Sequence, residues 1–240
     1  MELAPGLHRI GNDIVAVHLI VTDEGVTVID AGFSGHYQEL LTELRAAGRD
    51  VGDVRGVVLT HGDSDHIGFA ERLRRDHGIP VYVHEADAAR ARGEESTSPA
   101  WGKTRVGPTA KFLVYSARKG GLRTRHLSEV HPVTDGDVLD LPGEPRILGL
   151  PGHSPGSVAI HLPVARALFV GDAVTTRHVL TGTTGPQPAP FTDDPAGAAD
   201  ALEQLADIEA DWIVPGHGGP WTDGVPALLD AYRAAAAENS

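Results

Sequence analysis

Four side chains that can bind metal ions lie within six residues of one another. The apolar run VVLT ends in HGDSDH, which supplies His61, Asp63, Asp65 and His66. In a regular strand only alternate side chains share a face, but a tight turn through Gly62 and Ser64 can direct all four toward one cavity. Asp65 alone would also suit a helix N-cap, and His61 alone would suit the end of a strand. Because burying the four groups together without a cation would be electrostatically costly, the motif predicts a metal site.

Three later positions repeat the pattern of a metal-binding side chain placed where an apolar strand ends. They are His153 in LGLPGHSPG, Asp172 in ALFVGDA and His217 in WIVPGHGGP. Each lies beside a glycine, which permits a tight turn and close backbone approach, so the side chain can point inward without a clash. An earlier carboxylate, Asp30 in VIDAG, also follows an apolar strand pattern. A single position of this kind would carry little weight, whereas the ordered set predicts a shared site.

Taken in order, these positions resemble the metallo-β-lactamase superfamily, whose hallmarks are an Asp after an early strand, an HxHxDH motif, and then His, Asp and His. The resemblance extends from Asp30 to His217 and covers nearly the whole chain. It implies an α+β fold, the four-layer αββα sandwich, with residues 1–240 as a single domain. It also implies a binuclear metal centre in which one ion is held by His61, Asp63 and His153, the second by Asp65, His66 and His217, and both by a bridging Asp172. Asp30 would orient a ligand rather than bind metal itself.

The sequence departs from that family at Asp63, where HxHxDH has a histidine. A carboxylate is a harder, anionic ligand, so iron or manganese competes with zinc as the expected metal. A carboxylate here also resembles the HxExDH motif of the flavodiiron branch, which makes a non-haem di-iron redox or metal-binding protein the alternative function. That branch carries a flavodoxin domain, for which this chain has no room. Two divalent ions, with zinc favoured, are therefore expected.

The resemblance implies a hydrolase that acts through the two ions. Two divalent cations would partly neutralise Asp63, Asp65 and Asp172 and lower the pKa of a bridging water, so that a hydroxide forms near neutral pH. That hydroxide would attack a carbonyl polarised by one ion, with Asp65 and Asp172 as the catalytic residues. The expected substrate is a small molecule with an ester, lactone, thioester or amide bond. There are two non-enzymatic alternatives: the metals could be purely structural, or the change from His to Asp at position 63 could have turned the site into a binding module.

A second enzymatic interpretation starts from GHSPG at residues 152–156, which matches the GxSxG motif of serine hydrolases. Ser154, Asp172 and His217 occur in the chain order of an α/β-hydrolase triad. The residue after the nucleophile must donate its backbone N–H to the oxyanion hole, and Pro155 has none. This alternative also leaves HGDSDH unexplained, so it ranks below the metallo-hydrolase.

Three further features have ordinary explanations. GKT at residues 102–104 is similar to the end of a phosphate-binding loop, but Thr97 stands where that loop needs its first glycine. His84 follows a strand-like run, and His178 comes shortly after Asp172. Because a lone histidine is more often structural than a ligand, neither is included among the expected ligands.

Apolar and β-branched runs predict the strands that would position the site. They cover residues 14–21, 26–30, 54–60, 146–150, 157–162 and 167–171. Helices are predicted over 36–47, 66–76 and 226–237, and another begins at Asp194 with Pro195 in its first turn. This order suggests two β-rich halves covered by helices.

Residues 93–126 form a candidate lid or insertion, with Gly, Ser and Pro punctuation and one short helical pattern, KFLVYSARKGG. Between Ser96 and Ser128 there is no acidic residue, while the segment contains Lys103, Arg105, Lys111, Arg118, Lys119, Arg123 and Arg125. Either this is a solvated or subunit-facing surface, or Lys111, Tyr115, Arg118 and Lys119 belong to a lid that attracts an anionic substrate. Trp101, Phe112 and Tyr115 would then line a pocket, although burial or a homodimer contact explains them equally well.

Bulk composition limits the remaining possibilities. The net charge of −13 disfavours nucleic-acid binding, which needs a positive surface. The absence of cysteine requires histidine and carboxylate ligands for any metal. No apolar run is long enough for a membrane span, and MELAPGLHRIGNDI lacks the pattern of a signal peptide, so a cytoplasmic protein is expected.

Overall fold

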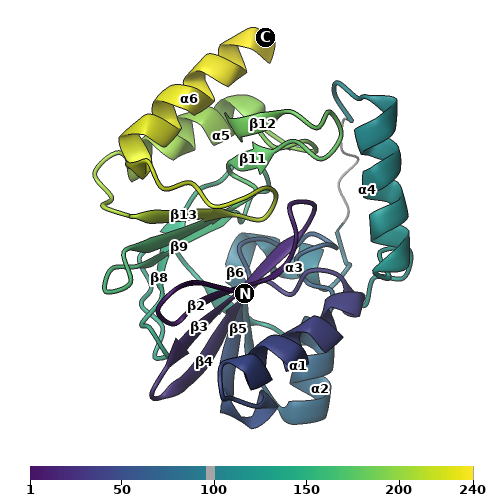
Figure 1. Cartoon of the computed structure of the whole chain (residues 1–240), viewed down its shortest axis with the longest axis vertical. Helices are drawn as coiled ribbons and strands as arrows, with labels where there is room; N and C mark the ends of the chain where they lie inside the picture. The colour runs from purple at the N-terminus through teal and green to yellow at the C-terminus, as the bar shows by residue number, and fades with distance from the viewer. Residues whose placement is uncertain (96–100, 240) are drawn as a thin grey trace.

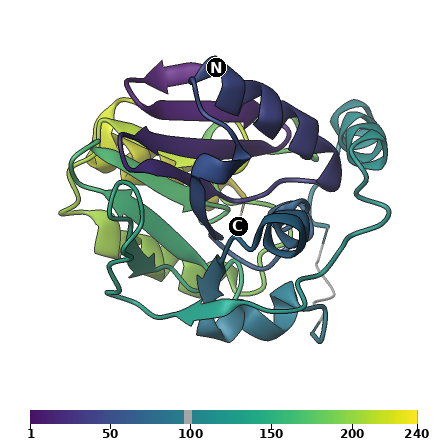
Figure 2. The ribbon, with the colours of Figure 1, turned by 90° about the horizontal axis from the view of Figure 1, so that it is seen from below.

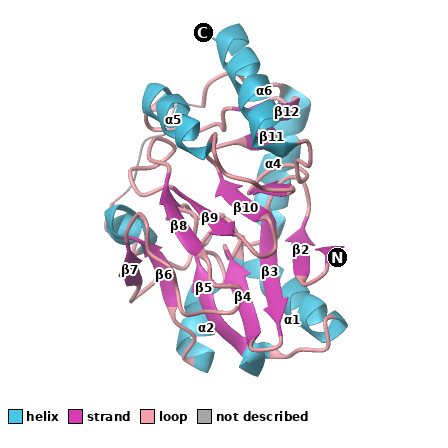
Figure 3. Ribbon diagram, turned by 90° about the vertical axis from the view of Figure 1, so that its left-hand side faces the viewer, coloured by secondary structure: helices cyan, strands magenta, loops and turns pink. Residues whose placement is uncertain are grey.

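The computed structural model describes residues 1–95 and 101–239, so Thr97 and part of the expected lid lie outside the described residues. Two β-sheets pack face to face with helices on their outer faces (Figures 1 and 3). The first sheet contains, in spatial order, β1 (Glu2–Ala4), β2 (Leu7–Gly11), β3 (Ala16–Thr22), β4 (Gly25–Ile29), β5 (Val54–Val58), β6 (Val81–His84) and β7 (His131–Val133). Its strands are antiparallel from β1 to β4 and parallel from β4 to β7.

The second sheet is smaller and also mixed. Its order is β13 (Trp212–Pro215), β10 (Ala167–Gly171), β9 (Val158–Leu162) and β8 (Arg146–Gly149), and only β10 and β13 pair in parallel. A separate hairpin-like pair consists of β11 (Thr175–Arg177) and β12 (Thr184–Gln187). All six expected strands are present, each shifted by no more than two residues at either end.

Three apolar cores separate the four layers. One lies between the two sheets and joins Ile29 and Val58 of the first sheet to Phe169 of the second. Another packs the first sheet against α1 (Tyr37–Ala46) and α2 (Ala70–His77). The last packs the second sheet against α5 (Pro195–Leu202) and α6 (Gly224–Asn239). Each sheet therefore buries both of its faces, which explains the continuous apolar runs in the sequence and confirms the predicted αββα sandwich.

Helix α4 (Val106–Arg118) lies beside this sandwich and outside its four layers (Figures 1 and 2). It confirms the helical pattern within the expected lid, and none of its side chains is fully buried. No helix in the described part of the chain is both long enough and apolar enough to cross a bilayer.

Two differences from the sequence prediction have clear physical causes. The helix expected over 66–76 begins only at Ala70, because the Gly68 and Phe69 amides donate to the carbonyls of Gly32 and Ala31. Strands β1, β2 and β7 are not among the predicted strands, because they are short and lie at or near the two opposite edges of the sheet, where β7 tolerates a proline. The cap at Asp194 is confirmed, since its side chain accepts a hydrogen bond from the Gly197 amide.

His18 of β3 is buried between the sheets and makes the fold sensitive to acid. Its ring packs 5.4 Å from that of Phe169, and its Nε2 has no hydrogen-bond partner within the described residues. Burial, reinforced by the charges of Arg9 and His66, lowers the pKa of His18 from 6.5 to about 3. The unfolded chain therefore binds a proton over a pH range in which the folded chain does not, and stability falls as the pH falls from 6.5 to about 3.

We expect His18→Leu to flatten this acid dependence. A single proton bound only by the unfolded chain contributes about 1.4 kcal/mol to the free energy of unfolding per pH unit. Urea titrations at pH 6, 5 and 4 should give the variant a slope smaller by about that amount than that of the unsubstituted chain. Equal slopes would show that His18 is not the group responsible.

Candidate metal centre

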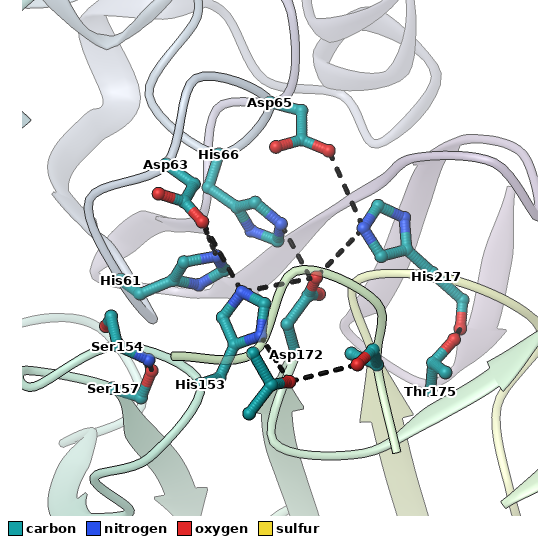
Figure 4. A network of polar contacts seen from close by, with 12 residues as sticks. His61, Asp63, Asp65, His66, His153, Ser154, Ser157, Asp172, Thr175 and His217 are labelled. Carbon is teal, nitrogen blue, oxygen red and sulfur yellow. Dashed lines mark hydrogen bonds and ion pairs between the residues drawn. The ribbon is translucent and has the colours of Figure 1, made fainter. Parts of the chain in front are cut away.

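The seven side chains that the sequence predicts as ligands converge at one edge of the sandwich (Figure 4). Four of them come from residues 61–66, directly after β5. The others, His153, Asp172 and His217, follow β8, β10 and β13. Parallel strands end at the same edge of a sheet, so β10 and β13 place Asp172 and His217 close together. The packing of the two sheets then brings these residues opposite the loop after β5.

The donor atoms fall into three overlapping groups, in each of which all atoms lie within 4.8 Å of one another. The groups are His61, Asp63 and His153; Asp65, His66 and His217; and His61, His66 and Asp172. In the first, Asp63 Oδ2 lies 3.6 Å from His61 Nε2 and 3.4 Å from His153 Nε2. In the second, Asp65 Oδ2 lies 3.5 Å from His217 Nε2. These two groups are the ligand sets that the resemblance implies.

Asp172 contacts members of both sets. Its Oδ2 lies 3.0 Å from His217 Nε2 and 3.8 Å from His153 Nε2, while its Oδ1 lies 3.4 Å from His66 Nε2. A carboxylate in this position can bridge two ions.

Three buried donor atoms at this centre have no hydrogen-bond partner among the residues that the structure describes, namely His61 Nε2, His66 Nε2 and Asp172 Oδ1. An unpaired buried polar atom is costly, and three facing the same space are satisfied together by cations. Histidine nitrogens and carboxylate oxygens are also donors that zinc, iron and manganese accept. The residues therefore fit a pair of divalent ions.

Each of the four histidines directs Nε2 inward and binds a partner outside the centre through Nδ1. His61 Nδ1 lies 3.0 Å from Thr60 Oγ1, and His153 Nδ1 lies 3.2 Å from Thr192 Oγ1. His217 Nδ1 donates to the carbonyl of Ile14. Because both threonine hydroxyls donate elsewhere, each accepts from the imidazole. The proton is thus held on Nδ1, and the Nε2 lone pair remains available for metal.

Asp30 is the outer partner of the fourth histidine. Its Oδ2 lies 2.9 Å from His66 Nδ1, and its Oδ1 accepts from the Thr60 amide at 2.8 Å. Asp30 adopts a left-handed backbone conformation, with φ of 61°, and belongs to none of the three donor groups. The structure thus places Asp30 where it orients both His66 and, through Thr60, His61.

The charges around the centre favour an ionised Asp172 and a protonated His66. Burial would raise the pKa of the Asp172 carboxyl, but the facing His217 and His66 hold that pKa well below its usual range. Burial would likewise lower the pKa of His66, but Asp30 and Asp172 raise it well above its usual value. Clustered carboxylates therefore favour a positive charge here, either a proton on His66 or a metal cation in its place.

A model of the family described as the metallo-beta-lactamase superfamily matches residues 10–217. The chain belongs to this superfamily. It is 30% identical over 233 residues to the probable metallo-hydrolase YflN of Bacillus subtilis (strain 168), which covers 92% of this chain and 87% of that protein. It is also 30% identical over 169 residues to the acyl-coenzyme A thioesterase MBLAC2 of Bos taurus, covering 67% of this chain and 54% of that one.

A solved structure of TTHA1623 in a di-iron-bound form is similar with a TM-score of 0.65 and 26% identity, covering 94% of this chain and 98% of that chain. The metallo-β-lactamase fold implies a binuclear divalent metal site, and the described residues include three donor groups that could hold metal ions. The four-layer sandwich and the family resemblance predicted from HGDSDH are both confirmed.

The structure also reveals a partner of Asp63 that the sequence did not indicate. Arg90 Nε lies 2.6 Å from Asp63 Oδ1, and its Nη1 donates to Asp193 Oδ2 at 2.9 Å. Burial would raise the pKa of Asp63, but His153, His61 and the Arg90 guanidinium hold it well below its usual range. At the position where the HxHxDH motif has a histidine, this chain has a carboxylate paired with the buried cation Arg90.

Asp87 is a second residue that the sequence did not indicate. It is buried on the turn before α3 (Ala88–Ala91), and its Oδ2 accepts hydrogen bonds from the Gly62 amide and from Ser154 Oγ, both at 2.7 Å. Its Oδ1 accepts from the Gly156 amide at 2.8 Å. Asp87 therefore joins the loop of His61 to the loop of His153.

The contacts of Ser154 rule out the serine-hydrolase alternative. Its hydroxyl is completely buried, donates to Asp87 and lies 2.8 Å from Ser157 Oγ. Ser154 is also followed by strand β9, whereas a nucleophile elbow leads from a strand into a helix. The GxSxG match thus marks a structural turn.

A cavity of about 440 Å³ opens from the metal centre toward α4. Trp101 and Phe112 line it, as one of the sequence interpretations expected. The four residues proposed for the lid, all within the described part of the chain, do not line this cavity. Lys111 and Arg118 are exposed elsewhere on α4. Tyr115 contacts His36, and Lys119 pairs with Glu39.

His84 and His178 belong to none of the donor groups, and their Nδ1 atoms accept local backbone hydrogen bonds.

Proposed function

We propose that this chain is a metal-dependent hydrolase that binds two divalent ions and cleaves an ester, lactone, thioester or amide bond of a small molecule. One observation carries the proposal: seven histidine and aspartate side chains converge at the inner end of a cavity large enough for a small ligand. Relatives named metallo-hydrolase and thioesterase support the same reaction class.

The proposed ligands are His61, Asp63 and His153 for one ion and Asp65, His66 and His217 for the other, with Asp172 shared. Two divalent ions held there supply Lewis acidity, which lowers the pKa of bound water toward neutrality and polarises a substrate carbonyl.

Asp65 and Asp172 have distinct roles in this proposal. Asp65 lines the cavity as well as the centre, so its carboxylate can orient a water molecule beside the substrate and accept a proton from it. Asp172 is held ionised by His217 and His66, so it keeps a negative charge between the two ligand sets.

Zinc is the proposed metal, and iron is the second candidate. The histidine-rich donor set suits zinc, whereas the carboxylate at Asp63 favours a harder ion. The di-iron form of TTHA1623 supports the second candidate and, with it, a redox or metal-binding role on the same fold.

Metal analysis combined with a substrate panel tests this function. The purified protein should contain two metal ions per chain and hydrolyse at least one member of a set of esters, lactones, thioesters and β-lactams. A chelator should abolish turnover while far-UV circular dichroism stays unchanged, and added zinc or iron should restore it. Chelator-insensitive hydrolysis would contradict the proposal, and a metal-loaded, folded protein that hydrolyses none of the panel would favour a binding module.

A further inference from the structure

The cavity that leads out of the metal centre changes character along its length. Its inner end is formed by five of the seven proposed ligands, with members of both sets, and its outer walls are formed by Phe33, Trp101, Phe112, Leu113, Val179 and Phe191. These apolar side chains come from α4 and from four loops in different parts of the sequence. A single space therefore joins the reactive centre to an apolar compartment.

The apolar walls are only partly covered by the protein itself. Phe112 and Phe191 are half-buried and pack against Phe33 and Val179. Leu113 and Trp101 remain 48% and 47% exposed although they line the cavity. Apolar surface left in water at such a place is covered favourably by an apolar ligand, with a gain of roughly 25 cal/mol per Å².

Few charged groups in this outer compartment are available to a charged substrate group. Beyond the ligand residues, the titratable side chains lining it within the described residues are Arg90, Glu95 and His126. Arg90 is engaged by Asp63 and Asp193, and Glu95 would repel an anion. The basic residues of α4 lie outside the lining. The compartment thus fits an uncharged chain rather than an anionic group.

We infer that the acyl group of the substrate is a linear apolar chain of several methylenes, bound between α4 and the loops that carry Phe33, Val179 and Phe191. This inference rests on the proposed function, because the metal centre fixes where the carbonyl lies. Leu113 is then a specificity-determining residue. Each additional methylene that enters the compartment contributes about 0.8 kcal/mol, or about fourfold in kcat/KM.

Hydrolysis of a homologous series tests the inference. With p-nitrophenyl acetate, butyrate, hexanoate and octanoate as substrates of the metal-loaded protein, kcat/KM should rise about fourfold per methylene until the compartment is filled. Leu113→Asp should lower kcat/KM for the octanoate by at least ~10-fold more than it lowers kcat/KM for the acetate.

Val114→Asp is the matched control. Val114 is the next residue on the same helix, is 50% exposed and does not line the cavity, so its substitution adds the same charge at similar exposure. We expect it to leave the chain-length profile unchanged. Leu113→Ala, which adds no charge, should lower the rate for the octanoate less than Leu113→Asp does. A flat profile in the unsubstituted protein, or equal effects of Leu113→Asp and Val114→Asp, would overturn the inference.

A binding measurement separates this inference from the proposed function. Titration calorimetry of the metal-loaded protein with octanoate and acetate needs no turnover, and octanoate should bind at least ~10-fold more tightly, with Leu113→Asp removing the difference. If the protein hydrolyses no substrate but binds octanoate more tightly than acetate, the proposed function is wrong and the apolar binding compartment is supported. If the protein hydrolyses a substrate but binds acetate as tightly as octanoate, the inferred compartment is wrong and the proposed function is supported.

Discussion

Replacing Asp172 with alanine should reduce the metal content from the proposed two ions per chain to below one and lower kcat of the proposed hydrolysis by at least ~10³-fold, equivalent to about 4 kcal/mol. The reason is its shared position: Asp172 Oδ2 lies 3.0 Å from His217 Nε2, and its Oδ1 lies 3.4 Å from His66 Nε2. Removing the carboxylate takes away a donor from both proposed ions and leaves the facing histidines without a counter-charge. Elemental analysis after dialysis and steady-state kinetics on the best panel substrate measure the two effects.

A control variant and a melting experiment accompany the test of Asp172→Ala. Asp207→Ala removes the same group from an exposed position and should leave both metal content and kcat unchanged. The metal-free forms of Asp172→Ala and of the unsubstituted chain should both melt cooperatively, which shows that the loss is not one of folding. An Asp172→Ala protein that retained two ions would contradict a bridging role.

The convergence of the proposed ligands could be predicted because each lies after an apolar strand. His61 comes after β5, Asp172 after β10 and His217 after β13, and strand ends within a mixed sandwich meet at a limited number of edges. The residue types then predict metal binding without any knowledge of the packing.

The surroundings of the ligands could not be predicted in the same way. Arg90 lies on a short helix among alanines, and its contacts reach Asp63 and Asp193, the latter 103 residues away. No local pattern indicates such pairs, because they depend on how two loops from different layers meet.

Helix α4 shows a similar limit. Its helical pattern is readable, but the face that it turns to the cavity depends on contacts with the segment 36–39. Tyr115 hydrogen-bonds His36 across 79 residues, and Lys119 pairs with Glu39 across 80. These contacts draw two of the expected lid residues away from the cavity and leave Phe112 and Leu113 facing it.

Substituting Arg90 with methionine should weaken binding of one ion 10–100-fold, which is the usual effect of losing a residue that orients a metal ligand. Arg90 Nε holds Asp63 Oδ1 at 2.6 Å and thereby leaves Oδ2 facing His153 and His61. Without the guanidinium, Asp63 can rotate, and its proposed ion should be lost first. Competition with a chromophoric chelator should show one tight and one weakened site.

Two further variants test whether Arg90 acts by orienting Asp63 or only through its positive charge. Arg90→Lys keeps the charge but lacks the planar fork, so we expect an intermediate loss of affinity. Asp193→Asn removes the other contact of Arg90 and should change metal affinity only slightly. If Arg90→Met instead tightened metal binding, the guanidinium would be acting mainly as a repelling cation, and its positioning role would be wrong.

A double-mutant cycle then tests why a carboxylate is tolerated at position 63. Asp63→His restores the residue of the HxHxDH motif but places an imidazole against the Arg90 guanidinium, so the single variant should bind its ion more weakly. Combining it with Arg90→Met removes that repulsion, and the double variant should regain affinity, with a coupling of roughly 0.5–3 kcal/mol between the two sites. Additive losses would mean that Asp63 and Arg90 act independently. A positive coupling would mean that the carboxylate and its buried cation together perform the task of the neutral histidine.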